Sequence, residues 1–250
     1  MTDLEKTQLS HLPSCMFSHL DSPLINAFVE RWQPDTNSFH FPFGEMTIML
    51  HDVWEILRIP VEGNLICTQT SSVDLKSEVM ELLGVDRSAL VDDGHWKSGA
   101  ISVDSITGNC GGGRSVDTQL MGYMLLLFGS TLFVDKSGNR VRPSELCELR
   151  HGIEDISGYA WGVATLANLY RQLGVASRAG TEGIAGCLTL LQAWIYEYFP
   201  MFRPHRERLV CASHGARAST WSIRMEGIAE ERLKSIRKRL DEMLDFEVIS

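Results

Sequence analysis

Two cysteine–histidine pairs are the residues of this chain whose types could bind a metal ion. Cys147 precedes His151 by four residues, and Cys211 precedes His214 by three. Two thiolates and two imidazoles are a ligand set that structural zinc uses. We favour unrelated roles for the two pairs, because structural zinc sites usually show tighter, repeated spacing. A weaker set at helical spacing lies near the N-terminus: His11, Cys15 and His19.

A glycine-rich stretch from Gly108 to Arg114 is a candidate phosphate-binding loop. We expect a helix to begin just after it, and the N–H groups at a helix N-terminus bind anions. The stretch departs from the P-loop consensus, because no Lys follows the glycines and no clear strand precedes them. We therefore favour a surface loop.

Three acidic residues, Glu45, Asp52 and Glu55, could supply a catalytic carboxylate pair. Asp52 and Glu55 are three residues apart and would share a helix face. We favour structural roles, in which Glu45 binds groups of a turn and the other two stabilise the positive end of a helix. The chain has no G-x-S-x-G elbow, and only Lys97 among six lysines is a candidate for a Schiff base. We therefore expect no enzyme activity, no metal and no cofactor.

Positive charge gathers in one segment of an acidic chain. The formal net charge is −9, yet the segment from Arg203 to Leu240 contains ten Arg or Lys residues and four Glu residues. Such a segment could contact DNA weakly and in a salt-dependent manner. We favour the alternative that Glu226, Glu230 and Glu231 pair with these cations at helical spacing. The candidate nucleic-acid-binding residues are Arg203, Arg206, Arg208, Arg217, Arg224, Lys234, Arg237, Lys238 and Arg239.

The hydrophobic pattern predicts a mainly α (α+β) fold, a helical bundle-like single domain with a small β-hairpin near residues 37–48. In the hairpin Phe39, Phe41 and Phe43 alternate with small or polar residues. Helices are predicted at 22–32, 50–59, 72–83, 117–133, 143–150, 157–173, 184–198 and 226–244. Ser22 should cap the first of these with its hydroxyl. Four tryptophans fall on apolar helical stripes and should pack in the core: Trp32, Trp54, Trp161 and Trp194.

The sequence predicts an N-terminal arm followed by one domain. Residues 1–20 lack clear periodicity and are expected to form the arm, and residues 21–250 the domain. Within it, 85–114 is rich in Gly, Ser and Asp and is expected to be an irregular insertion. The composition is that of a soluble globular protein, and no apolar run is long enough to span a membrane. Six scattered cysteines and the lack of a signal sequence favour a reducing compartment.

Five motifs occur in the order typical of one family. They are the helix Leu24–Trp32, the turn Gly44–Thr47, the apolar run Tyr123–Lys136 ending in Phe-x-Asp-Lys, the Tyr-Ala-Trp-Gly motif 159–162, and the Gly-Cys-x-x-x-Leu-Gln-x-Trp motif 186–194. In this order they resemble the plant mobile domain, known from transposons and from plant proteins of the Maintenance-of-Meristems group.

The chain departs from the family pattern at three places. Met49 stands where Thr is usual, so the helix after the hairpin should lack that N-cap. Val163 stands where Ser is usual. The chain ends at Ser250, where the family often continues into Trp and a Pro-Tyr pair, so we expect a domain truncated at its C-terminus.

The resemblance implies a nuclear protein that acts in transposon silencing, gene expression and meristem maintenance. It also implies complexes with other plant mobile domain proteins and with phosphatase-like proteins. We therefore expect a non-catalytic protein-interaction module. The alternative is a nucleic-acid-binding module that uses the basic segment 203–240.

Overall fold

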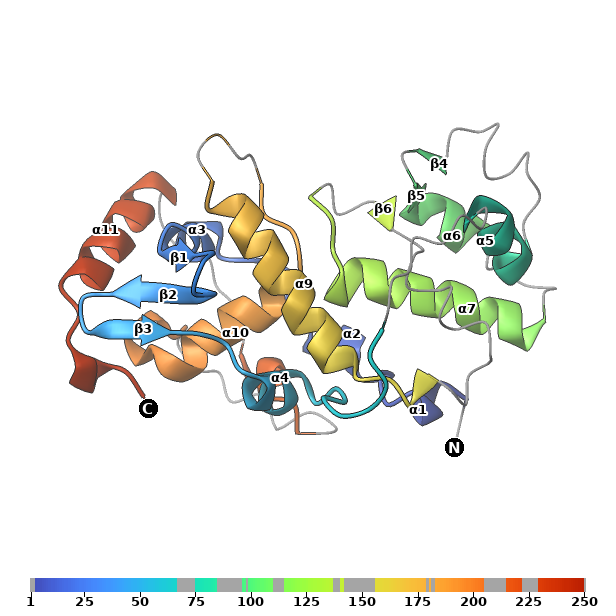
Figure 1. Ribbon diagram of the computed structural model, residues 1–250, viewed down its shortest axis with the longest axis horizontal. Coiled ribbons are helices and arrows are strands. Elements are labelled where there is room, and N and C mark those ends of the chain that lie inside the picture. The colour runs from blue at the N-terminus through green and yellow to red at the C-terminus, as the bar shows by residue number, and fades with distance from the viewer. Residues whose placement is uncertain are drawn as a thin grey trace.

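A computed structural model describes residues 3–66, 75–84, 96–97, 99–109, 115–136, 140–141, 156–178, 180, 183–204, 215–221 and 229–249. These residues are mainly helical, with two three-stranded antiparallel sheets, β1-β2-β3 and β4-β5-β6. The predicted fold class is confirmed. The first sheet lies with α3, α10 and α11 in one half of the molecule, and α5, α6, α7 and the second sheet lie in the other (Figure 1).

The segment that we expected to be an arm contributes to the core. It contains two short helices, α1 (Asp3–Lys6) and α2 (Leu12–Cys15). Leu9, Leu12 and Cys15 are spaced by three residues, and all three side chains are buried in the main cluster. This spacing places them on one side of a helical turn, so the segment packs against the body.

Helix α3 (Ser22–Val29) begins at the predicted residue, but it has a different capping residue and ends earlier than predicted. The side chain of Asp21, one residue before Ser22, accepts a hydrogen bond from the Leu24 N–H at 3.3 Å and caps the helix. The helix stops at Val29 because the chain turns into β1 (Trp32–Gln33), where Trp32 pairs with Phe39.

The predicted hairpin is confirmed as β2 (Ser38–Phe41) and β3 (Gly44–Met46). The tight turn Pro42–Phe43 joins them, and Gly44, the first residue of β3, leaves the turn with φ +142°. The inward-facing rings of β2 join residues from α3 and the end of α10 in what we call the aromatic cluster: Phe28, Phe39, Phe41, Trp194 and Phe199. The rings of Phe28 and Phe199 lie 4.9 Å apart, and those of Phe39 and Trp194 5.4 Å.

Helix α4 (Leu50–Leu57) follows the hairpin and is capped without the family's Thr. The Asp52 carboxylate accepts a hydrogen bond from the Met49 N–H at 2.7 Å, which is the reciprocal half of a capping box. Arg58, with φ +53°, ends the helix in the left-handed conformation.

The stretch 85–114, expected to be irregular, contains regular structure in its described part. Strand β4 (Trp96–Lys97) pairs with β5 (Ala100–Ser102), and helix α6 (Val103–Asn109) follows. Ile101 and Ile106 are buried in the core. The third strand, β6 (Arg140–Val141), lies forty residues further along the chain. Its pairing with β5 cannot be predicted from the local sequence pattern. The predicted helix 143–150 and residues 110–114 of the glycine-rich stretch lie outside the described residues.

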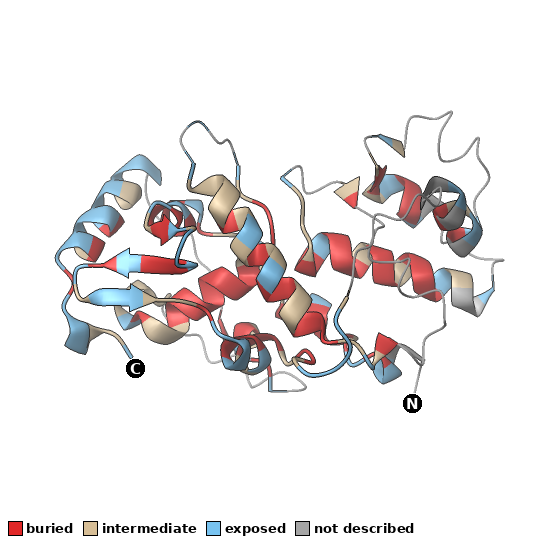
Figure 2. Cartoon of the chain, viewed as in Figure 1, coloured by how far each residue is buried: buried red, intermediate tan, exposed pale blue. Residues whose placement is uncertain are grey.

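The other predicted helices are found close to their expected positions. Helix α7 continues directly into a π-helical turn, η2, and together they span 116–132, close to the predicted helix 117–133. Helix α10 is buried along most of its length, whereas α11 is largely exposed (Figure 2). The elements are α5 (Leu75–Leu83), α7 (Val116–Leu127), η2 (Phe128–Leu132), α9 (Trp161–Ala176), α10 (Leu188–Tyr198), η4 (Pro200–Phe202), η5 (Arg217–Thr220), α11 (Ala229–Asp241) and η6 (Asp245–Glu247).

Two distant segments run side by side where α9 begins. The Gly162 N–H donates to the Pro60 carbonyl at 2.7 Å, and the Asn64 N–H donates to the Gly158 carbonyl at 2.8 Å. A Cβ on Gly162 would lie 2.7 Å from a methyl carbon of Val61, so only glycine permits this approach. The contact fixes the start of α9 against the segment that follows α4.

Candidate interaction surface on helix α4

Three large apolar side chains are exposed at the start and along the outer face of α4. Met49 is 55% exposed, Leu50 39% and Trp54 40%. Leu50 and Trp54 are four residues apart and therefore share a face of the helix. The prediction that Trp54 packs in the core is wrong, because α4 turns Val53 and Leu57 inward instead. The other three tryptophans, Trp32, Trp161 and Trp194, are buried as predicted.

Trp54 also forms one wall of a groove. The Arg58 guanidinium lies over the Trp54 ring at 5.3 Å from its centroid, an arrangement that favours a cation–π attraction. The Nε2 atom of His11 lies 2.7 Å from the Leu57 carbonyl oxygen and holds the N-terminal segment beside α4. The groove between them has a volume of about 680 Å³ and is lined by Glu5, Gln8, Ser10, His11, Trp54, Arg58 and Gly215. We call Met49, Leu50, Trp54 and Arg58 the α4 surface.

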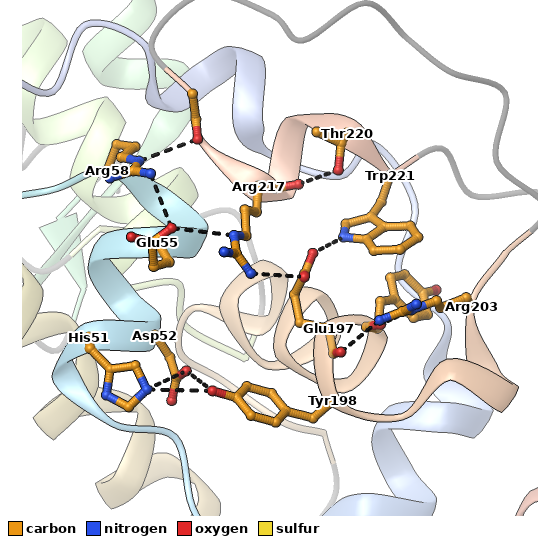
Figure 3. Close-up of polar contacts among 12 residues, drawn as sticks. His51, Asp52, Glu55, Arg58, Glu197, Tyr198, Arg203, Arg217, Thr220 and Trp221 are labelled. Carbon is orange, nitrogen blue, oxygen red and sulfur yellow. Dashed lines mark hydrogen bonds and ion pairs between the residues drawn. The ribbon is translucent and has the colours of Figure 1, made fainter. Parts of the chain in front are cut away.

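The inner side of α4 is joined to α10 by a hydrogen bond to a buried carboxylate. The Tyr198 hydroxyl donates to Asp52 at 2.5 Å, and His51 Nε2 lies 3.2 Å from the same carboxylate oxygen (Figure 3). Burial, followed by the hydrogen bond to Asp52, raises the pKa of Tyr198 above its ordinary value. Tyr198 is therefore a neutral donor at physiological pH, and Asp52 both caps α4 and accepts from α10.

Arg217 on η5 also joins α4 to α10, one turn further along α4 than Asp52. Its guanidinium contacts Glu55 of α4 and Glu197 of α10, each at 3.3 Å (Figure 3). Glu55 also pairs with Arg58, and Glu197 accepts a hydrogen bond from the Trp221 indole N–H at 3.0 Å. A cleft of about 360 Å³ lies here, lined by His51, Asp52, Glu55, Ile56, Glu197, Tyr198, Arg203, Arg217 and Ile249.

The three acidic residues singled out in the sequence have structural contacts. Glu45 lies on β3, where it accepts a hydrogen bond from the Ser38 hydroxyl at 2.7 Å and faces His40. Asp52 and Glu55 are joined to α10 and η5 as described above. Lys97 lies exposed on β4. These contacts favour the structural interpretation over a carboxylate pair for acid–base chemistry.

The described members of the predicted nucleic-acid-binding set each contact an acceptor of the protein itself. Lys234 pairs with Glu230 at 2.8 Å, at the helical spacing that we expected. Arg237 pairs with Glu30 of α3, Lys238 with Glu242, and Arg239 with Glu247. Arg203 donates to the carbonyls of Tyr196 and Glu197, and Arg217 joins α4 to α10. Three members lie outside the described residues: Arg206, Arg208 and Arg224.

The candidate metal ligands are only partly covered by the structure. Cys147, His151, Cys211 and His214 all lie outside the described residues, so the expectation that the two pairs have unrelated roles stays a prediction. In the N-terminal set, His11 is directed at a backbone carbonyl and the buried Cys15 thiol lies 3.5 Å from the His11 carbonyl oxygen. Among the described residues, no group of three or more His, Cys, Asp or Glu could hold a metal ion.

A family model confirms the resemblance seen in the sequence. The model of the plant mobile domain matches residues 10–249. The chain belongs to the plant mobile domain family. This domain is similar to three Arabidopsis thaliana proteins: MAIN-LIKE 2 (35% identical over 92% of this chain), MAINTENANCE OF MERISTEMS (33% over 90%), and a serine/threonine-protein phosphatase 7 long form homolog (33% over 79%).

The relatives are much longer than this chain. It spans 35% of MAIN-LIKE 2, 46% of MAINTENANCE OF MERISTEMS and 15% of the phosphatase homolog. No solved structure matches it significantly. Within the part of the chain that the structure describes, no helix is long and apolar enough to cross a bilayer.

Proposed function

We propose that this plant mobile domain is a non-catalytic protein-interaction module that binds its partner through the α4 surface. The observation that carries the proposal is the exposure of Leu50 and Trp54 on one short helix and of Met49 directly before it. Clustered apolar side chains on a surface are typical of protein interaction sites, and Trp and Arg are enriched among the residues that dominate binding energy. Trp54 and Arg58 form such a pair.

The polar network behind α4 supports this role because it makes the surface rigid. Asp52 and Glu55 connect α4 to α10 and η5 through Tyr198 and Arg217. A preorganised helix loses little conformational entropy on binding. The same contacts occupy the carboxylates that an acid–base mechanism would need, which supports a non-catalytic function.

The partner that we propose is a second plant mobile domain protein or a phosphatase-like protein, within a nuclear complex. The family membership and the names of the relatives support this proposal. One relative is named for the maintenance of meristems, and another is named as a phosphatase homolog and contains a region similar to this chain. We further propose roles in transposon silencing, gene expression and meristem maintenance.

A binding experiment with two matched variants tests the proposal. The purified domain is mixed with the Arabidopsis MAINTENANCE OF MERISTEMS protein or with the phosphatase 7 long form homolog, and complex formation is measured by light scattering and calorimetry. Trp54→Ser should weaken binding by about 2 kcal/mol or more, which is roughly 30-fold. Phe246→Ser removes another exposed ring, on η6, and should leave binding unchanged.

Three outcomes would contradict the proposal. The first is that neither protein binds the wild-type domain. The second is that Trp54→Ser and Phe246→Ser bind equally well. The third is tight, sequence-selective binding of duplex DNA at physiological salt, which would favour the nucleic-acid-binding alternative. A fluorescent fusion expressed in plant cells tests the nuclear location.

A further inference from the structure

A second cleft lies between α11 and the body of the domain, and arginines dominate its charge. It has a volume of about 410 Å³. Three of its lining residues are arginines from different places in the chain, Arg203, Arg232 and Arg239, and Asp21 is the one carboxylate among the residues that line it. Arg232 pairs with Asp21 and Arg239 with Glu247, so among the described residues Arg203 is the cleft arginine without a carboxylate partner. Its positive charge, in a chain of net charge −9, favours an anionic occupant.

Two of these arginines are fixed in position and keep donors for a ligand. Arg203 donates through Nε to the Tyr196 carbonyl at 2.5 Å and through one terminal nitrogen to the Glu197 carbonyl at 2.8 Å. Its guanidinium also lies 5.5 Å from the Trp221 ring centroid. Arg239 contacts Glu247 through one terminal nitrogen. A guanidinium carries five N–H donors, so these contacts with described residues leave further N–H groups on both side chains.

Apolar side chains form part of the cleft wall. Tyr196 and Ile236 are buried, and Met201 and Phe202 are partly buried. An occupant therefore gains from apolar contact as well as from charge. Arg–carboxylate hydrogen bonds are strong and directional, and an apolar side chain beside the carboxylate would contact the partly buried Met201 and Phe202.

We infer that this cleft binds an acidic peptide segment of a partner protein, in which Asp or Glu residues flank a large apolar side chain. The protein nature of the partner rests on the proposed function, whereas the charge and apolar wall of the cleft do not. Duplex DNA fits the cleft less well. Strong DNA binding needs many phosphate contacts, and the acidic remainder of the chain repels a polyanion.

The inference is tested by fluorescence anisotropy with a fluorescein-labelled Asp/Glu-rich peptide that has a central Leu-Phe pair. The wild-type domain should bind this peptide saturably, and a version with Asn and Gln in place of Asp and Glu should bind far less. Ser235 lines the cleft and is exposed on α11, so Ser235→Glu adds a repelling carboxylate without removing an arginine. Affinity for the peptide should fall about tenfold or more. Arg239→Gln should weaken binding in the same direction.

Two control variants separate local repulsion from general effects. Ser235→Gln has nearly the size of Ser235→Glu without its charge, and Gln33→Glu adds the same charge on β1. Both should bind like wild type. The inference is overturned if the wild-type domain does not bind the peptide, if Ser235→Glu binds it as wild type does, or if duplex DNA displaces the peptide at physiological salt. Trp54→Ser should bind the peptide normally, so failure of the α4 surface and failure of this cleft are distinguishable.

Discussion

Replacement of Trp161 by Ala should destabilise the domain severely. The Trp161 ring is fully buried at the start of α9. Its centroid lies 4.4 Å from that of Phe128, at the junction of α7 and η2, and 5.8 Å from that of Tyr159. The indole N–H donates to the Ile156 carbonyl at 2.8 Å. Trp161 thus joins α9 to α7 and to the segment before it.

The expected loss of folding stability follows from these contacts. Truncation of a buried Trp to Ala costs about 3–5 kcal/mol through lost burial and the cavity left behind. The Ile156 carbonyl would lose the hydrogen bond from the indole and keep its 3.4 Å contact with the Tyr159 N–H. Loss of the indole hydrogen bond adds about 1 kcal/mol to the cost of the substitution. The free energy of unfolding should therefore fall by about 4–6 kcal/mol, much of the total stability of a typical domain.

Urea unfolding followed by circular dichroism measures this loss, with Trp54→Ala as the matched control. Trp54 is 40% exposed and has Arg58 over its ring, so its truncation should cost about 1 kcal/mol. The packing argument is refuted if Trp161→Ala unfolds within about 1 kcal/mol of wild type. It is also refuted if the two variants lose similar stability.

Three further predictions concern other contacts of the structure. Gly162→Ala should cost about 1–3 kcal/mol in chemical denaturation, because its Cβ would overlap Val61, and wild-type stability would contradict the close approach. Tyr198→Phe removes the donor to Asp52 and should cost about 1–2 kcal/mol at pH 7. Because the pKa of Tyr198 is raised by folding, its contribution is complete below about pH 10 and declines above it, so the gap between wild type and Tyr198→Phe should narrow in alkaline unfolding. Burial raises the pKa of the Cys187 thiol to about 12, so iodoacetamide at pH 8 should alkylate Cys187 only in denaturant, as read by peptide mass spectrometry; rapid native labelling would contradict this.

The local sequence pattern predicted the positions of the helices and strands better than it predicted which of their faces are buried. The alternation of Phe39 and Phe41 was enough to predict the hairpin, and the long apolar runs were enough to predict α7, α9 and α10. In α4 the apolar residues Leu50 and Trp54 form one face and Val53 and Leu57 another, and the sequence alone does not say which turns inward. The choice follows from tertiary contacts.

The contacts that define the two candidate surfaces are non-local. Asp52 is a charged residue at a buried position because Tyr198, on a helix more than 140 residues away, donates to it. The arginine-lined cleft likewise depends on how α11 lies beside α3 and η4. Residue spacing contains no signal for such convergence, and the sequence therefore indicated a basic segment but not a cleft.

The aromatic cluster has a consequence for synthesis of the chain on the ribosome. Phe28, Phe39 and Phe41 emerge early, whereas Trp194 and Phe199, which cover them, follow more than 150 residues later. At translation rates of about 5–20 residues per second, the hairpin rings wait about 8–30 s for these partners. During that time the nascent hairpin presents uncovered rings, and such exposed apolar surface promotes aggregation and is the reason that chaperones are needed. Cellular yield of this domain should thus depend on chaperone supply more strongly than the stability of the finished fold suggests.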